Sequence, residues 1–215
     1  MKRFAVVLAG CGVFDGAEIH EAILTLLAIA KQGASYRIFA PDVDQHHVLD
    51  HLTGKEMKEK RNVLAESARI ARGEILPLVQ FNPDDFDALV FPGGFGVAKN
   101  LCTFAFDGPD CRVNPDVERT LRQMKEAGKP IGAMCISPVL LARTFPGAEL
   151  TLGDDRGSIE AVEAMGAAHR VTTHGEVVVD RDRKFFSTPC YMLDASITDI
   201  AAGTENLVKE MLKAM

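Results

Sequence analysis

Cys135 is the residue of this chain best suited to covalent chemistry. It follows a short apolar segment, Pro130–Met134, that predicts a buried strand, and it precedes a helix predicted to begin near Pro138. A nucleophile on such a strand-to-helix elbow needs small residues two positions to either side, and here these are Ala133 and Ser137. The alternative is a small buried cysteine of the core. The elbow favours a nucleophilic thiol near a helix N-terminus, where backbone N–H groups stabilise a thiolate.

Two carboxyl groups could act on that thiol. Glu18 and Glu21 lie one helical turn apart, at the start of a helix that follows the first predicted strand. Acidic residues in a first turn commonly do no more than complement the helix dipole. The functional alternative is that one of them points toward Cys135. An ionised carboxylate would raise the pKa of the thiol, whereas a protonated carboxyl could donate a hydrogen bond to the thiolate and lower that pKa.

A glycine-rich loop offers backbone donors for an oxyanion. Pro92-Gly93-Gly94-Phe95-Gly96 follows a buried strand, and glycines allow the backbone to approach a ligand closely. We expect the N–H groups of Gly94 and Ile136 to form an oxyanion hole, with Gly93 beside them. A tight turn that needs positive φ is compatible with this role.

No histidine is an obvious base for the thiol. The residue directly after Cys135 is Ile136, so no histidine is adjacent to the thiol in the sequence. His174-Gly175-Glu176 imitates the His-x-Glu of a Cys-His-Glu triad, but it precedes its predicted strand instead of following it. His20, between the two glutamates, and Cys11, in the preceding loop, are further candidates for the pocket wall.

The elements that must position these residues alternate between strand and helix, which predicts a doubly wound, mainly parallel α/β sheet. In such a sheet the loops at the carboxyl ends of the strands gather the functional groups. The predicted strands are 4–9, 36–40, 88–91, 130–134 and a hairpin of 177–180 with 184–187; the predicted helices are 18–31, 63–71, 115–127, one from about 138, 158–165 and 194–213.

Composition narrows the class of protein. The 215 residues suit one domain, 1–215, and the net charge of −6 without a basic stripe argues against nucleic-acid binding. No apolar run is long enough to span a bilayer. The first residues enter a strand pattern at once, so we expect a cytoplasmic protein. The five cysteines show neither a disulfide framework nor a zinc motif, and no nucleotide loop has the required spacing, so no cofactor or metal is expected.

Four motifs together resemble the ElbB family of isoprenoid-biosynthesis (enhancing lycopene biosynthesis) proteins, within the PfpI-like, class I glutamine amidotransferase-like superfamily. They are Gly10-Cys11-Gly12-Val13-Phe14-Asp15-Gly16-Ala17-Glu18-Ile19-His20-Glu21, Phe91-Pro92-Gly93-Gly94-Phe95-Gly96-Val97-Ala98-Lys99-Asn100-Leu101, Met134-Cys135-Ile136-Ser137-Pro138 and Thr188-Pro189-Cys190-Tyr191-Met192. The resemblance implies a flavodoxin-like fold, homodimers, a reactive Cys135 and, at Glu21, the carboxyl that hydrogen-bonds it. It also implies a cofactor-independent glyoxalase activity.

Three functional hypotheses follow. The first is a thiol enzyme of the glyoxalase type, in which Cys135 adds to a small dicarbonyl and Glu21, with Glu18 or His20, moves the proton between the two carbons. The second is a noncatalytic redox sensor or regulator that uses the same thiol. The third is an amidotransferase-like partner subunit, which would need His174 within hydrogen-bond reach of Cys135. Ile136 after the cysteine argues against the peptidase activity of relatives that carry histidine there.

Overall fold

A seven-stranded sheet forms the centre of the protein, whose computed structural model describes all 215 residues. The strand order is β3-β2-β1-β4-β5-β9-β8, and every neighbouring pair is parallel except β8 and β9. A separate two-stranded sheet is formed by β6 and β7. The strands are β1 Arg3–Val7, β2 Ser35–Ala40, β3 Ile75–Pro77, β4 Ala88–Phe91, β5 Ile131–Met134, β6 Glu149–Leu150, β7 Ala168–His169, β8 Val178–Asp180 and β9 Phe185–Thr188.

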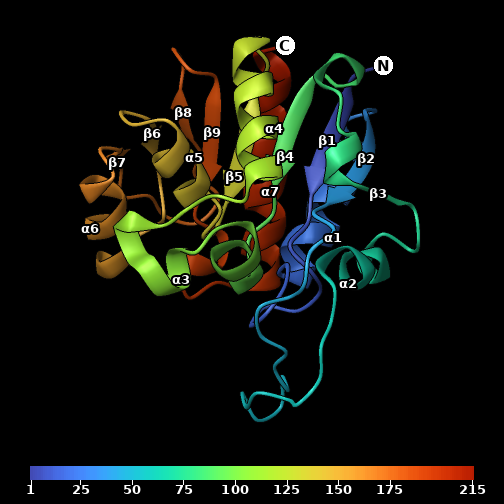
Figure 1. Ribbon diagram of the computed structural model, residues 1–215. Coiled ribbons are helices and arrows are strands. Elements are labelled where there is room, and N and C mark those ends of the chain that lie inside the picture. The colour runs from blue at the N-terminus through green and yellow to red at the C-terminus, as the bar shows by residue number, and fades with distance from the viewer.

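Helices cover both faces of the sheet, with α4 and α5 on one face and α1 and α7 on the other (Figure 1). This double coverage explains why β1 and β4 are continuous apolar runs instead of alternating patterns. The α-helices are α1 Ile19–Lys31, α2 Val63–Ile70, α3 Phe104–Asp107, α4 Pro115–Glu126, α5 Pro138–Thr144, α6 Arg156–Ala164 and α7 Ile197–Lys213. Short helical turns are η1 Leu78–Gln80, η2 Pro83–Asp85, the π-helical η3 Val97–Leu101, η4 Gly108–Asp110 and η5 Cys190–Met192.

The predicted fold class is confirmed, and the differences concern element ends. Helix α1 begins at Ile19 because the Glu18 side chain accepts the Glu21 N–H as an N-cap. Helix α7 begins at Ile197, three residues later than predicted from position 194, because Ser196 and Asp199 form a capping box. The short strands β3, β6 and β7 were not predicted, since two or three residues carry no usable periodicity. The five-residue π-helical turn η3 and the four-residue helix α3 were not predicted either.

The strand order determines which loops meet. Because β1, β4 and β5 are neighbours and run in parallel, the loops that follow them share one edge of the sheet. In Figure 1 the helix α3 and the long segment 42–62 lie at the end of the molecule opposite the two labelled termini. None of the helices is long and apolar enough to cross a membrane.

Candidate active site

Cys135 lies on a strained turn between β5 and α5. Its φ is +56°, a left-handed conformation that is uncommon for a residue with a side chain. Its N–H donates to the Thr188 carbonyl at 3.1 Å, and the Ser137 hydroxyl donates to the Pro92 carbonyl at 2.7 Å. The turn is therefore tied to β9 and to the loop after β4, and Cys135 as a whole residue is only 7% exposed.

Glu21 supplies the carboxyl that reaches the thiol. It is fully buried on the inner face of α1, and its carboxyl lies beside the Cys135 side chain, next to Gly93. Its Oε2 accepts the Gly93 N–H at 2.8 Å and its Oε1 accepts the Tyr191 N–H at 3.3 Å. A Cβ on Gly93 would lie 2.6 Å from Glu21 Oε2 and 2.4 Å from Cys135 Cβ, so only glycine fits between the two side chains.

Burial dominates the protonation of the pair. It raises the pKa of Glu21 to about 8, and the negative charge of Glu18 adds to this effect, against the two backbone N–H donors. At neutral pH the Glu21 carboxyl therefore keeps its proton. Burial, followed by the charge of Glu21, also raises the pKa of Cys135, while the N–H groups of Gly94 and Ile136 oppose the rise. The lowering of the thiol pKa that the sequence suggested is thus not the net direction, because desolvation of the thiolate outweighs the donors.

The predicted oxyanion donors lie beside the sulfur. The N–H groups of Gly94 and Ile136 donate to no backbone carbonyl, and both lie near enough to the Cys135 sulfur to favour its ionised form. Gly94 has φ +101°, and a Cβ there would lie 2.4 Å from the Glu18 nitrogen. The Gly93 N–H is different, because it is already committed to Glu21.

Glu18 supports the site without facing the thiol. Its Oε2 caps α1 by accepting the Glu21 N–H at 2.7 Å, and its own N–H donates to the Gly93 carbonyl at 2.9 Å. His20 is exposed, with Nδ1 2.8 Å from the Tyr191 hydroxyl and 4.0 Å from Glu18 Oε1. Glu18 therefore contacts Glu21 and His20 lies near Glu18, and neither of them lines the cavity at the Cys135 thiol.

Two other candidates lie elsewhere. Cys11 is half-buried next to Glu66 and Arg69 of α2, and it does not line the cavity that Cys135 lines. His174 is exposed, with Nε2 3.0 Å from the Asp194 carbonyl oxygen, and it does not line that cavity either. The hydrogen bond between His174 and Cys135 that an amidotransferase triad requires is absent.

Sequence reasoning missed the contribution of the turn η5. Tyr191 holds the Glu21 carboxyl through its N–H, and its ring lines the cavity at Cys135. Cys190, with φ +44°, is buried close enough to Glu21 and Cys135 for their charges to raise its pKa, after the larger effect of burial. The position of η5 directly after β9 could have indicated that it lies near Cys135. That inference needs the pairing of β9 with β5, which is not visible in the sequence.

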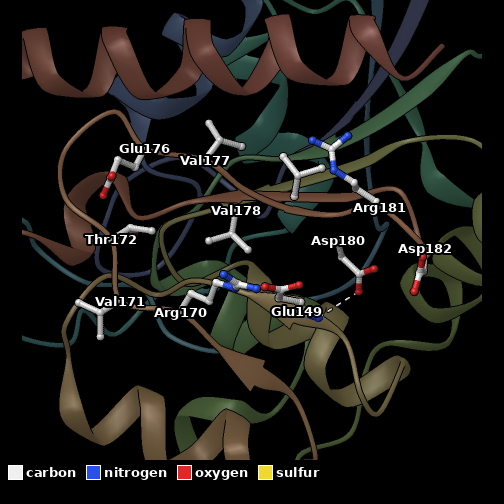
Figure 2. Close-up of a pocket in the computed structure, with 11 residues that line it drawn as sticks. Glu149, Arg170, Val171, Thr172, Glu176, Val177, Val178, Asp180, Arg181 and Asp182 are labelled. Carbon is white, nitrogen blue, oxygen red and sulfur yellow. Dashed lines mark hydrogen bonds and ion pairs between the residues drawn. The ribbon is translucent and has the colours of Figure 1, made fainter.

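A cavity of about 410 Å³ opens at the thiol. Its polar residues are Cys135, Asp155, Ser158 and Tyr191, and most of the remaining wall is apolar. A second cavity of about 500 Å³, shown in Figure 2, lies along β8 and contains charged groups such as Asp180, whose Oδ2 accepts the Glu149 N–H at 3.0 Å. This second cavity has no thiol or hydroxyl nucleophile other than Thr172, so the cavity at Cys135 is the stronger candidate for a site of covalent chemistry. No group of three or more His, Cys, Asp or Glu side chains is arranged to hold a metal ion.

Comparisons with known proteins agree with this architecture. A model of the DJ-1/PfpI family matches residues 9–183. The mitochondrial ES1 protein homolog of Rattus norvegicus is 49% identical over 98% of this chain and 83% of its own length. The human protein named glutamine amidotransferase-like class 1 domain-containing protein 3, mitochondrial, is 48% identical over 98% of this chain and 82% of its own length.

Solved structures are similar over the whole chain. The isoprenoid biosynthesis protein with amidotransferase-like domain from Ehrlichia chaffeensis has a TM-score of 0.92 and 35% identity, covering 99% of this chain and 100% of the other. Glyoxalase III from Candida albicans has a TM-score of 0.64 and 12% identity, covering 100% and 97%, which is a likeness of fold alone.

The expected cytoplasmic location is contradicted. The rat and human relatives, at 49% and 48% identity, are both mitochondrial proteins by name. The prediction rested on the pattern of the first few residues, which does not determine the compartment.

Proposed function

The chain belongs to the DJ-1/PfpI family, and from the geometry around Cys135 we propose that it is a cofactor-independent thiol enzyme of the glyoxalase type, which converts a small dicarbonyl and water to a 2-hydroxy acid. The observation that carries the proposal is the buried Glu21–Cys135 pair with two backbone N–H groups beside the sulfur that donate to no backbone carbonyl. A nucleophile, a proton carrier and an oxyanion hole are the three groups that this reaction needs.

The reacting form of the pair carries one proton, held by Glu21, after the proton of the Cys135 thiol has passed to solvent. In the proposed first step the Cys135 thiolate of this form adds to the aldehyde carbon, and a carbon–sulfur bond forms while the carbonyl π bond breaks. The new oxyanion lies between the Gly94 and Ile136 N–H groups and takes the proton of the Glu21 carboxyl. This leaves a hemithioacetal and an ionised Glu21, which is then ready to act as a base.

In the second step Glu21 removes the hydrogen of the former aldehyde carbon as a proton and returns it to the neighbouring carbon. The hydroxyl proton on the first carbon passes to the keto oxygen of the second. The first carbon is thereby oxidised to a thioester and the second is reduced to an alcohol, so no external oxidant or reductant is required. Water then cleaves the thioester, which releases the hydroxy acid and restores the Cys135 thiol.

Similarity within the family supports a narrower assignment. We propose that the chain is an ElbB-like member, since the Ehrlichia chaffeensis protein that matches it at 35% identity is named as an isoprenoid biosynthesis protein. A link of this chain to isoprenoid metabolism rests on that name and on the four motifs, and the geometry of the site does not bear on it.

Product formation over many enzyme equivalents tests the proposed reaction. Wild type should convert glyoxal to glycolate and methylglyoxal to lactate in repeated turnovers, and Cys135→Ala should abolish the product. Cys11→Ala is the matched control, because that thiol lies outside the cavity. Consumption that stops near one equivalent, or that survives in Cys135→Ala, would contradict the enzyme and favour the redox-sensor alternative.

A further inference from the structure

The wall of the Cys135 cavity is apolar away from the reacting atoms. The sulfur and the Gly94 and Ile136 N–H groups form one polar end. The remaining wall comes mainly from the loop after β1, the turn η3 with its preceding loop, the helix α3 and the turn η5. Its apolar members are Val13, Phe95, Ala98, Phe104, Ala105 and Met192.

The size of the cavity exceeds what glyoxal would fill. Its volume of about 410 Å³ lies in the range of pockets that enclose ring-bearing small molecules. Glyoxal, with two carbons and two oxygens, would occupy the polar end and leave the apolar wall in contact with water. An apolar wall that stays wet contributes nothing to binding, whereas a substituent that covers it does.

Charge excludes anionic substrates from this cavity. No lysine, arginine or histidine lines it, and its one ionisable carboxylate, Asp155, accepts the Ser158 N–H at 2.9 Å as the N-cap of α6. The Lys99 ammonium lies 5.5 Å from the ring centroid of Phe95, but it donates to the Phe14 carbonyl at 2.8 Å and does not itself line the cavity. A carboxylate or phosphate on the substrate would therefore lose its hydration without gaining a cation.

From this lining we infer that the substrate is an uncharged 2-oxoaldehyde that carries an apolar substituent, aryl or branched alkyl, on its keto carbon. This inference rests on the proposed function. The aldehyde carbon lies at Cys135 Sγ, its oxygen lies between the two N–H donors, and the substituent packs against Phe95, Phe104 and Met192. The overall reaction is the one written above, with the substituent unchanged and one water consumed.

The preference should be large enough to measure. Burying an aryl group instead of a methyl group removes several more carbons from water, and a single methylene in a hydrophobic pocket is worth about 10-fold or more in discrimination. We therefore expect kcat/KM for phenylglyoxal to exceed that for methylglyoxal by at least about 10-fold. Each value should first be divided by the rate of the same aldehyde with a small free thiol, which removes differences in electrophilicity.

The test compares glyoxal, methylglyoxal, phenylglyoxal and 4-carboxyphenylglyoxal on the wild-type protein, with the 2-hydroxy acid quantified. The carboxylated ring should lose most of the advantage of the neutral ring. Phe104→Ala should lower kcat/KM for phenylglyoxal about 10-fold more than that for glyoxal. Phe106→Ala is the matched control on the same helix, because Phe106 is 45% exposed and does not line the cavity; it should leave the ratio unchanged.

The outcomes separate this inference from the proposed function. Turnover of glyoxal that depends on Cys135, without a gain for phenylglyoxal, would overturn the substrate class and leave the reaction standing. An equal effect of Phe104→Ala on all substrates would also overturn it. If no aldehyde yields a hydroxy acid over many equivalents, the proposed function itself fails.

Discussion

The carboxyl of Glu21, on the first helix, lies beside the thiol of Cys135, just after the fifth strand, where almost no solvent reaches either group. One proton added or removed here changes the charge of the whole buried pair. Because the two groups interact closely, their protons leave in steps that belong to the pair. The first step falls at about pH 8, and the second lies well above the usual pKa of a thiol.

The first prediction concerns the pH dependence of alkylation. The rate of iodoacetamide reaction at Cys135 should rise through about pH 8 as the pair loses its first proton, and rise again at higher pH. Glu21→Gln removes one titrating group and the charge that raises the thiol pKa, so its profile should show a single step. The measurement is the alkylation rate from pH 6 to 11, with Cys135 identified by peptide mass. Two steps in Glu21→Gln would contradict the assignment.

Glu18 should set the position of the first step. Its charge raises the pKa of Glu21, so Glu18→Gln should move the first inflection below pH 8 while the amide oxygen still caps α1. The same alkylation profile measures this shift. The matched control is Glu205→Gln, since Glu205 pairs with Lys31 and Lys209 on the helix surface. An unchanged inflection in Glu18→Gln would show that burial alone sets the Glu21 pKa.

Stability should fall as pH rises, because the folded protein keeps a proton that the unfolded chain has released. The pKa of Glu21 is raised from 4.5 to about 8 by folding, so between these values the native state binds more protons. The resulting loss in the free energy of unfolding, relative to its value at low pH, approaches about 5 kcal/mol by pH 8. We expect the free energy of unfolding in urea to decrease more from pH 5 to pH 8 in wild type than in Glu21→Gln. Parallel decreases in the two proteins would refute this linkage.

The sequence was sufficient to predict the elements that position Cys135, the proposed nucleophile. The strand Ala88–Phe91 was predicted at its observed bounds, because glycines and a proline end an uninterrupted apolar run. The elbow at Cys135 was visible in the small residues at Ala133 and Ser137. Both signals are local and need no knowledge of the tertiary fold.

The remaining features of the site are not local. Tyr191 reaches Glu21 only because β9 inserts beside β5, and a strand order cannot be read from periodicity. Likewise, the direction of the Cys135 pKa depends on how completely the folded chain excludes water from the thiol. Glu18 and Glu21 both lie at the start of the same helix, so the sequence pattern alone does not show which of them is near the thiol. The choice of Glu21 rested on family resemblance.

Gly93 should be essential for the geometry of the pair. In Gly93→Ala the added Cβ would lie 2.4 Å from Cys135 Cβ and 2.6 Å from Glu21 Oε2, so both side chains must move. The new methyl would also weaken the N–H donation to Glu21, which lies at 2.8 Å. We expect at least a 100-fold loss of Cys135-dependent turnover, because a displacement of about 1 Å in a catalytic group can cost that much.

The matched control for this substitution is Gly157→Ala, on α6. A Cβ there would meet its nearest atom, Asp155 Oδ2, at 3.9 Å, and the backbone is helical, so alanine should stabilise α6 by about 0.5–1 kcal/mol. Turnover and thermal unfolding are measured for both variants. If Gly93→Ala is folded and as active as Gly157→Ala, the Glu21–Cys135 contact does not govern the chemistry, and a different carboxyl must supply the proton.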